Sequence, residues 1–355
     1  MKPLTLGILG GGQLGRMSAL AAARLGIKTV IFTPETDSPA SHVAFKTFVA
    51  EYEDERALRE FSESVHVISY EFENIPIKTI QYLEKLKPVY PDKTLLEIAQ
   101  DRITEKSTLN ALGIPTARWA TPQSAQEAQD ILKQWGASAC IFKTTRMGYD
   151  GKGQARFTAP AAMEPLWDTF NSTPLIMEEV VDFTKELSVI VARDFKGKTE
   201  YYGPMWNEHH NHILSRTQIP APVPEHLAEQ ARAMTRTLAE AVHLRGVLTL
   251  ELFLARDGTL LANEIAPRTH NSGHWSIEAC VISQFENHVR AVCGLPVAPP
   301  ARHSDAEMLN ILGENIKDME KFLDEPHTAV HHYGKQEPRT GRKMGHITRL
   351  LRKET

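Results

Sequence analysis

The sequence predicts an α/β protein of two or three domains, and three observations point to this class. Its 355 residues exceed the usual size of a single domain, about 100–200 residues. The N-terminal segment reads as strand, glycine-rich turn, helix and strand, the repeating unit of a parallel sheet. A β-hairpin is predicted much later, from Val247–Leu254 and Thr259–Ile265, because both runs are apolar and Asp257-Gly258 between them favours a tight turn.

Composition places the chain among ordinary globular proteins. Apolar residues make up 42% and charged residues 24%, and the formal net charge is −4. This charge argues against a nucleic-acid partner, so anionic ligands must be bound by local clusters. Three cysteines without metal spacing, Cys140, Cys280 and Cys293, favour free thiols in a reducing compartment. With no membrane-length apolar run and no secretory pattern, we expect a cytoplasmic protein without a membrane partner.

The first unit contains a glycine fingerprint with two interpretations. A strand at Leu4–Leu9 leads into Gly10, Gly12 and Gly15, which fit G-x-G-x-x-G, and a helix follows to about Leu25. Glu35 lies about 20 residues further on, as dinucleotide sites require. The motif itself states only that backbone N–H groups and a helix N-terminus can hold a phosphate. NAD and a sugar phosphate therefore remain equal alternatives at this point.

The rest of the first unit alternates helix and strand. We expect a helix at Glu53–Glu63, a strand at Val65–Tyr70, and helices near Ile77–Leu86 and Lys93–Leu112. The polar string Tyr70–Asn74 follows the strand, where open α/β sheets bind ligands, although solvated carboxylates are an equal alternative. Gly113 and Pro115 then indicate a domain boundary.

A lysine and a glycine-rich loop mark the second unit. A helix at Gln123–Trp135 precedes a strand at Ala139–Lys143, and the loop Thr144–Gln154 follows. Mobile backbone donors beside a lysine charge suit phosphate, although the loop is not a Walker A motif and a hairpin tip remains possible. Further strands are predicted at Leu175–Val181, Glu186–Asp194 and Thr199–Met205. A zinc site at His209, His210 and His212 is disfavoured because no further ligand completes it.

The late hairpin predicts a pair of opposed carboxylates. A two-residue turn makes cross-strand positions sum to 515, which places Arg256 opposite Thr259 and Glu251 opposite Glu264. Two like charges there favour a bound cation, and oxygen ligands suit Mg²⁺, although a solvated sheet face is the plainer reading. The residues after the second strand tip the balance, because polar side chains crowd its exit: Arg268, His270, Asn271, Ser272 and His274.

The C-terminal part is predicted to contain a helix at Ser276–Val292, a linker at Leu295–Pro300 and a small third unit. Four basic residues form a hook within that unit: Lys335, Arg339, Arg342 and Lys343. A solvated charge run is the default interpretation. Gly341 and Gly345 suggest a constrained turn, so a phosphate or acid-intermediate site is the alternative.

Taken together, these motifs resemble the ATP-grasp carboxylate–amine ligases, most closely the family of 5-(carboxyamino)imidazole ribonucleotide synthases of purine biosynthesis. The resemblance spans nearly the whole chain. It rests on GGGQLGRM at Gly10–Met17, YEFENI at Tyr70–Ile75, DRITEK at Asp101–Lys106, GYDGKGQ at Gly148–Gln154, NEIAPRTHNSGHWS at Asn263–Ser276, and the hook. It implies a Rossmann-like, parallel-sheet pre-ATP-grasp domain at 1–112, an ATP-grasp domain at 113–295 with a lid at about 113–182, and a small C-terminal domain at 296–355.

The resemblance also implies a ligand set. Glu251 and Glu264 would hold Mg²⁺, although Ala266 stands where many ATP-grasp enzymes carry a second-metal Asn. ATP, rather than NAD, becomes the expected nucleotide. The residues implied to contact ATP are Arg102, Lys143, Gly148, Tyr149, Asp150, Gly151, Lys152, Gly153, Gln154, Glu178, Glu179, Val180, Val181, Glu186, His209, Asn263 and Glu264.

The implied reaction joins ATP, bicarbonate and 5-aminoimidazole ribonucleotide, through carboxyphosphate. Arg268 and Lys335, with Arg342, are assigned to bicarbonate and carboxyphosphate. Asp150 is the candidate proton acceptor. The residues expected at the ribotide are Gln13, Leu14, Glu71, Glu73, Tyr149, Asp150, His270, Asn271, Ser272, Lys335 and Arg342. A homodimer and product hand-off to a mutase are the implied partners.

Three alternatives remain at this stage. A ligase using formate or an amino acid is disfavoured by the HNSGHW string. An NAD-dependent oxidoreductase would rest on Gly10–Gly15 alone. A non-catalytic nucleotide-binding protein is disfavoured by the combination of Lys143, Glu251 and Glu264.

Overall fold

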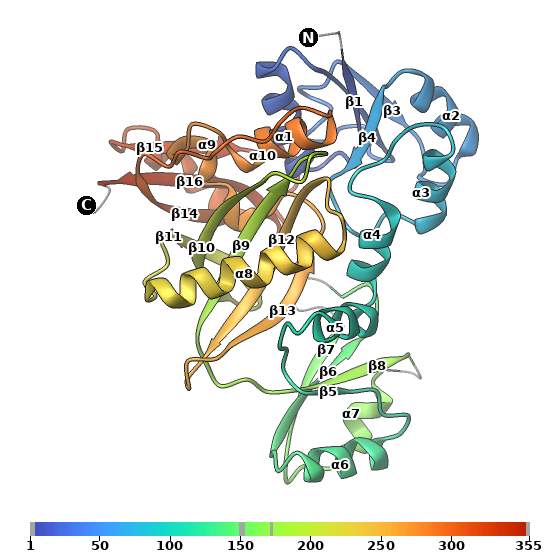
Figure 1. Cartoon of the computed structure of the whole chain (residues 1–355), viewed down its shortest axis with the longest axis vertical. Coiled ribbons are helices and arrows are strands. Elements are labelled where there is room, and N and C mark those ends of the chain that lie inside the picture. The colour runs from blue at the N-terminus through green and yellow to red at the C-terminus, as the bar shows by residue number, and fades with distance from the viewer. Residues whose placement is uncertain (1–3, 149–152, 171–172, 353–355) are drawn as a thin grey trace.

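The chain folds around three β-sheets (Figure 1). The structure is a computed structural model, and it describes residues 4–148, 153–170 and 173–352. A parallel sheet forms the N-terminal part, a large antiparallel sheet the centre, and a small antiparallel sheet a separate lobe at the far end of the molecule.

The N-terminal sheet is parallel throughout, in the order β3-β2-β1-β4. Its strands and helices are β1 (Thr5–Leu9), α1 (Gln13–Arg24), β2 (Lys28–Thr33), β3 (Lys46–Val49), α2 (Glu55–Glu63), β4 (Val67–Tyr70) and α3 (Ile77–Glu84). The predicted strand–turn–helix–strand unit is confirmed, whereas β3 was not predicted. Because parallel strands share one carboxyl edge, β1 and β4 deliver the glycine turn and the segment 71–74 to the same place.

One predicted helix is two. The pattern at 93–112 divides into α4 (Lys93–Gln100) and α5 (Arg102–Ala111). Asp101 has extended backbone angles, and its carboxylate accepts hydrogen bonds from the N–H groups of Ile103 and Thr104. An aspartate in this role starts a new helix, and the break turns α5 towards the central sheet.

The small lobe is an antiparallel sheet in the order β5-β8-β6-β7, with two helices on one face. Its elements are β5 (Trp119–Ala120), α6 (Ala125–Gln134), β6 (Ala139–Thr144), β7 (Gln154–Thr158), α7 (Glu164–Asp168) and β8 (Leu175–Glu179). Phe142 lies buried at its centre and meets Trp167 edge-on. This lobe has its own apolar core, separate from the cores of the other two sheets.

The central sheet has eight strands in the order β13-β12-β9-β10-β11-β14-β16-β15. Its elements are β9 (Phe183–Arg193), β10 (Thr199–His210), β11 (Ile213–Ile219), α8 (Glu225–Ala241), β12 (Gly246–Ala255), β13 (Leu260–Ala266), β14 (Asp305–Leu312), β15 (Thr328–His332) and β16 (Lys343–Leu351), with a 3₁₀ segment η2 at Gly313–Phe322. The predicted third unit therefore does not carry a sheet of its own, because β14 pairs with β11.

The predicted helix at 276–292 also divides. A 3₁₀ turn η1 (Asn271–Gly273) and a short α9 (Ser276–Ala279) precede α10 (Gln284–Val292). The Ser283 hydroxyl accepts a hydrogen bond from the N–H of Glu286 and starts α10. Helix α10 packs between α1 and β12, so it joins the N-terminal domain to the central sheet.

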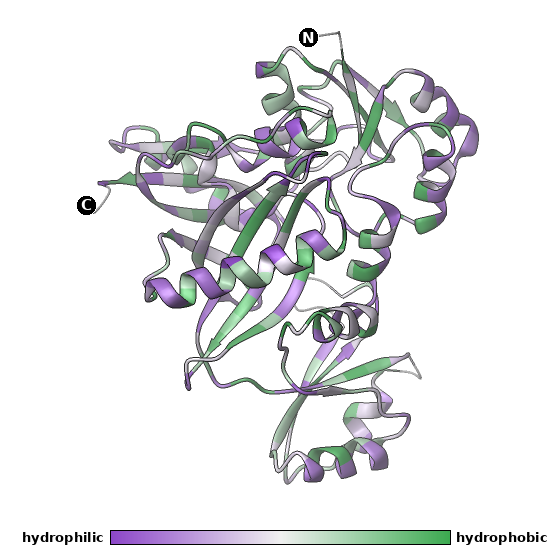
Figure 2. Ribbon diagram, viewed as in Figure 1, coloured by the Kyte–Doolittle hydropathy of each residue, from purple (hydrophilic) through white to green (hydrophobic). Residues whose placement is uncertain are grey.

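Hydropathy follows this arrangement (Figure 2). The central strands are apolar, and α8 shows alternating polar and apolar stretches along its length. Ala231 and Leu238 on α8 are fully buried against Leu248 and Leu250 of β12. Among the described residues, no helix is both long and apolar enough to cross a lipid bilayer.

Candidate active site

The turn between β12 and β13 has three residues rather than two. Ala255 donates its N–H to the carbonyl of Thr259 at 2.9 Å, which encloses residues 256–258. The predicted pairing of Arg256 with Thr259 is therefore wrong, and the Arg256 N–H binds the carbonyl of Asp182 instead. Near the turn, cross-strand positions sum to 514, one less than predicted.

A β-bulge restores the predicted register at the carboxylates. The pairs on either side of the bulge are Leu250 with Ile265 and Leu252 with Ala262. Glu251 therefore lies opposite the two-residue segment 263–264. A bulge places two residues against one and re-aims their side chains. The predicted opposition of Glu251 and Glu264 survives, but a bulge rather than a tight turn produces it.

Helix α5 fastens this bulge. The Lys106 ammonium donates to the carbonyl oxygen of Asn263 at 2.9 Å, and the Glu105 carboxylate accepts from the N–H of Ile265 at 2.6 Å. The backbone on both sides of Glu264 is thus held by neighbouring residues of one helix. Burial raises the pKa of Glu105 to about 8, against the lowering effect of Lys106. We did not predict these roles, although both residues lie in the DRITEK motif.

Arg102, at the start of α5, spans the gap between the lobes. Its guanidinium lies 3.5 Å from the Glu264 carboxylate and donates to the carbonyl of Gly148 at 3.3 Å. Burial alone would lower the pKa of Arg102, but the Glu264 and Glu105 carboxylates raise it. A permanent cation therefore faces both the hairpin carboxylate and the glycine-rich loop.

A buried triad of charges lies at the root of the small lobe. The Lys143 ammonium is 2.9 Å from the Glu178 carboxylate, and Lys106 is 3.5 Å from the same oxygen. Burial would raise the pKa of Glu178, but the two lysines lower it to about 2. Glu179 points elsewhere, to Arg118 in a partly exposed ion pair.

Two acid–histidine pairs lie on the face of the central sheet. His209 Nδ1 is 2.7 Å from Glu186, and His270 Nε2 is 2.9 Å from Glu251. Burial would lower the pKa of His209, but Glu186 raises it. His209 therefore pairs with a carboxylate and does not assemble with the neighbouring histidines, while His212 contacts Gln154 at 3.3 Å.

Hydrogen bonds from β9 and β14 of the central sheet hold the loop after β13 in place. His270 Nδ1 lies 2.8 Å from the Ser272 hydroxyl, which accepts from the Ser188 hydroxyl at 2.8 Å. Asn271 and Asn310 exchange amide hydrogen bonds of 3.0 and 2.8 Å. His270 thus faces the site, whereas Asn271 and Ser272, both buried, support the loop.

The glycine turn holds a carboxylate of the chain itself. Glu71 accepts hydrogen bonds from the backbone N–H groups of Gly12 and Gly15, the latter at 2.6 Å. Gln13 and Leu14 begin α1 just beyond them, and Leu14 is buried in the core. Burial raises the pKa of Glu71, although the two N–H donors lower it. Two N–H groups of the glycine turn, those of Gly12 and Gly15, therefore already have an anionic partner.

Glu73 links the N-terminal domain to the central sheet. Its carboxylate forms a two-point ion pair with Arg268, with the Nη2 contact at 2.9 Å. Burial would raise the pKa of Glu73, but Arg268 lowers it to about 2. Segments almost 200 residues apart in sequence thus meet at one ion pair.

The basic hook closes the site from the C-terminal side. Burial, followed by the nearby Arg342, lowers the pKa of Lys335 to about 8, while Glu71 acts in the opposite direction. Arg342 donates to the carbonyl of Glu337 at 2.9 Å. Gln336 donates to Asp37 of the N-terminal domain at 3.1 Å. Lys335 is therefore placed beside the glycine turn.

Part of the glycine-rich loop lies outside the described residues, namely Tyr149, Asp150, Gly151 and Lys152. On either side, Gly148 accepts from Arg102 and Gly153 accepts from the N–H of Thr144 at 2.8 Å. Gln154 begins β7. The end of the loop at Gly148 thus lies next to Arg102, and the end at Gly153 lies beside β6.

Family comparisons cover the chain in three parts. The ribonucleotide synthetase preATP-grasp domain matches residues 1–100, the ATP-grasp domain matches 107–285, and the phosphoribosylaminoimidazole carboxylase C-terminal domain matches 306–355. The three matches follow the order of the parallel sheet, the lobes around Lys143 and Glu251, and the hook.

Individual relatives agree with this assignment. An N5-carboxyaminoimidazole ribonucleotide synthase of Brucella melitensis is 45% identical, covering 98% of this chain and 96% of its own. One of Bacillus subtilis is 39% identical, covering 98% and 92%. A crystal structure of such a synthetase with ADP superposes with a TM-score of 0.94 at 38% identity, covering 99% and 93%. One from Aspergillus clavatus, with ADP and 5-aminoimidazole ribonucleotide, gives 0.89 at 27%, covering 98% and 94%. The chain belongs to the family of N5-carboxyaminoimidazole ribonucleotide synthases, which are ATP-dependent ligases of the ATP-grasp superfamily.

Proposed function

We propose that this chain carboxylates the amine of 5-aminoimidazole ribonucleotide, using ATP and bicarbonate and releasing ADP and phosphate. The observation that carries the proposal is the convergence of three sheets on one set of charges. Lys143 comes from β6 of the small lobe, Glu251 from β12 and Arg268 from the loop after β13, and Glu73 from the loop after β4 of the parallel sheet.

Bicarbonate is a weak electrophile, so ATP must activate it. Attack of a bicarbonate oxygen on the γ-phosphorus forms carboxyphosphate and ADP, and its breakdown to CO₂ and phosphate delivers CO₂ to the amine. The protein's contribution is positioning, charge stabilisation and exclusion of water. We assign Arg268 and Lys335 to the anionic intermediate, since both are partly buried cations at the junction of the domains.

ATP is proposed to lie between the small lobe and the central sheet. Lys143 and Arg102 would face the phosphates. Each cation would then lie between ATP and its present carboxylate partner, Glu178 for Lys143 and Glu264 for Arg102. The further residues proposed at ATP are Gly148, Tyr149, Asp150, Gly151, Lys152, Gly153, Gln154, Glu179, Val180, Val181, Glu186, His209 and Asn263.

The opposed carboxylates fit Mg²⁺. Glu251 and Glu264 supply only oxygen donors, which suit this ion together with phosphate oxygens. Glu251 is held by His270, and the backbone at Glu264 by α5, so both have fixed positions. When bound, Mg²⁺ would neutralise part of the phosphate charge. We therefore propose that Glu251 and Glu264 hold it.

The ribotide is proposed to lie between the glycine turn and the hook. Because Glu71 already takes the N–H groups of Gly12 and Gly15, we assign the substrate phosphate to the backbone of Gln13 and Leu14 at the start of α1, with Lys335 and Arg342 of the hook lining the same site. His270 would line the same space. Tyr149 and Asp150, outside the described residues, keep their proposed roles at the aminoimidazole, with Asp150 as proton acceptor.

Assembly and location complete the proposal. We propose domains at 1–112, 113–295 and 296–355, a homodimer, and a cytoplasmic site of action with hand-off to a mutase. Leu20 and Phe45 are 46% and 65% exposed and offer apolar surface for a second copy. Sedimentation equilibrium tests the dimer, and a monomeric mass at micromolar concentration would refute it.

The first experiment is phosphate release from ATP with Mg²⁺, omitting one substrate at a time. We expect strong dependence on both bicarbonate and 5-aminoimidazole ribonucleotide. Turnover with formate or an amino acid in place of bicarbonate would support a different ATP-grasp ligase. Absence of turnover with all substrates present would contradict the proposal.

A further inference from the structure

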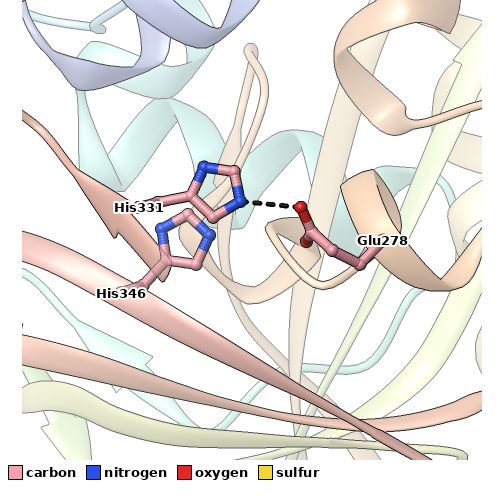
Figure 3. Close-up of side chains that lie close together, drawn as sticks. All are labelled: Glu278, His331 and His346. Carbon is pink, nitrogen blue, oxygen red and sulfur yellow. Dashed lines mark hydrogen bonds and ion pairs between the residues drawn. The ribbon is translucent and has the colours of Figure 1, made fainter. Parts of the chain in front are cut away.

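A second cluster of titratable groups lies outside the site described above (Figure 3). It comprises Glu278 of α9, His331 of β15 and His346 of β16. The two histidines are directly opposed in the β15–β16 pair, and their rings stack with centroids 4.3 Å apart and planes 5° apart. One potential ligand atom from each of the three residues lies within 4.8 Å of the other two.

Two atoms of this cluster are buried and lack a partner. His331 Nε2 pairs with Glu278 Oε1 at 2.7 Å. Within the described part of the chain, Glu278 Oε2 and His346 Nε2 make no hydrogen bond. A buried polar atom left unpaired costs about 1–3 kcal/mol. Both unpaired atoms belong to residues of the cluster whose potential ligand atoms lie within 4.8 Å of one another, which points to a shared ligand.

The remaining nitrogen of His346 is already engaged. Its Nδ1 lies 2.8 Å from the Tyr333 hydroxyl, which also contacts His274 at 3.2 Å. A metal-binding histidine usually has its other ring nitrogen held in this way. The Tyr333 contact thus fixes the orientation of the His346 ring and leaves Nε2 as the nitrogen that can bind a metal.

We propose that Glu278, His331 and His346 form a binding site for a zinc-type divalent cation. Two imidazole nitrogens and one carboxylate oxygen suit Zn²⁺ and disfavour Mg²⁺, which prefers oxygen alone. This donor set therefore distinguishes the cluster from Glu251 and Glu264. The partial exposure of His331 and Glu278, with side chains 25% and 17% accessible, provides an entry path.

Binding requires the donor atoms and the two stacked rings to move. Metal–ligand bonds of about 2.0–2.2 Å draw the three donor atoms closer than 4.8 Å, and each ring must turn so that the ion lies near its plane. The ion would then join α9, which follows the loop bearing His270, to the two strands that flank the hook. We therefore expect the bound ion to hold β15 and β16 against α9 and the loop that bears His270.

The test is calorimetric titration of the full, untagged chain with ZnCl₂, after chelator treatment and with excess Mg²⁺ present. We expect one zinc per chain. His331→Gln and Glu278→Gln should each weaken binding by at least about tenfold, since even outer-shell changes at metal sites cost that much. Both side chains are partly exposed, so these variants should fold, and circular dichroism checks this.

Two matched controls identify the site. His226→Gln removes an exposed histidine of α8, and His212→Gln removes one from the other histidine cluster; both should bind zinc as the parent does. Anomalous scattering at the zinc edge should place the ion between Glu278, His331 and His346. Absence of binding, equal affinity in all variants, or an ion placed at His209–His212 would overturn the proposal.

Discussion

Two clusters of the site bind a carboxylate in different ways. Buried Glu178 lies between the ammonium groups of Lys143 and Lys106. Partly buried Glu71 instead accepts hydrogen bonds from the backbone N–H groups of Gly12 and Gly15. The pKa of Glu178 falls to about 2, whereas that of Glu71 is raised.

The difference lies in how close the cations are. Two adjacent ammonium groups outweigh the desolvation of Glu178, whereas two N–H donors, with Lys335 and Arg268 further away, do not outweigh that of Glu71. The Glu178 cluster is thus an anchored ion network. In the Glu71 cluster, burial lowers the pKa of Lys335 to about 8, so this one group titrates closer to neutral pH. Substitutions in each cluster can test this distinction.

The largest expected effect is on stability, from Lys106→Met. This change removes the second cation from Glu178 and leaves the Asn263 carbonyl unpaired. Breaking a buried pair costs about 3–5 kcal/mol, measured as a shift in the urea midpoint. The loss should shrink as pH falls from 4.5 towards 2, because Glu178 is then protonated. Lys85→Met, at an exposed lysine, is the control. A loss of unfolding free energy below about 1 kcal/mol for Lys106→Met would contradict the account of Glu178 as a buried ion network.

Next in size is the effect of Lys143→Met on catalysis. If Lys143 stabilises the phosphate charge of ATP, kcat/KM for ATP should fall by about 10²–10³. Steady-state phosphate release measures this. Lys133→Met, an exposed lysine of the same lobe, serves as the control. Comparable activity in the two variants would remove Lys143 from the nucleotide site.

A smaller effect is expected for Glu71→Gln. The amide offers one acceptor oxygen, so one N–H of the glycine turn loses its partner at a cost of about 1–3 kcal/mol. KM for the ribotide should rise and KM for ATP should stay constant. Glu35→Gln tests the NAD interpretation of the same motif and should change neither. Tighter ribotide binding in Glu71→Gln would mean that Glu71 competes with the substrate phosphate for the turn.

The smallest effect concerns pH. Lys335 has a pKa of about 8, so it is protonated below that value and loses its charge above it. Between pH 7 and 9, kcat/KM for the ribotide should fall about tenfold if this charge binds the substrate. Lys335→Arg retains its charge over this range and should remove the fall. An identical pH profile in the variant would exclude Lys335 as the titrating group.

Sequence reasoning went furthest where a local rule determined the outcome. Residues 71–74 were expected to follow a strand at the carboxyl edge of the parallel sheet, and they do follow β4 there, while a ligand site at this edge stays a prediction. The opposition of Glu251 and Glu264 was also expected, although a three-residue turn and a bulge compensate each other to produce it. The breaks before α5 and α10 have a local signal in the sequence, since Asp101 and Ser283 are both favourable N-cap residues.

What could not be predicted depends on long-range contacts. A glycine fingerprint states that donors are available, but not that Glu71, 56 residues from Gly15, occupies them. The hydrogen bonds from Glu105 and Lys106 to the backbone of β13 join positions about 160 residues apart. In the same way, β14 extends the central sheet because β11 leaves an open edge, which local patterns do not reveal.

The central claim is that ATP activates bicarbonate, and an oxygen-transfer measurement tests it most directly. With ¹⁸O-labelled bicarbonate, ATP and 5-aminoimidazole ribonucleotide, the attacking oxygen stays on phosphorus when carboxyphosphate breaks down. Mass spectrometry should therefore find one ¹⁸O atom in the phosphate released per turnover. Phosphate without label, formed while the ribotide is consumed, would contradict carboxyphosphate and the function proposed for this site.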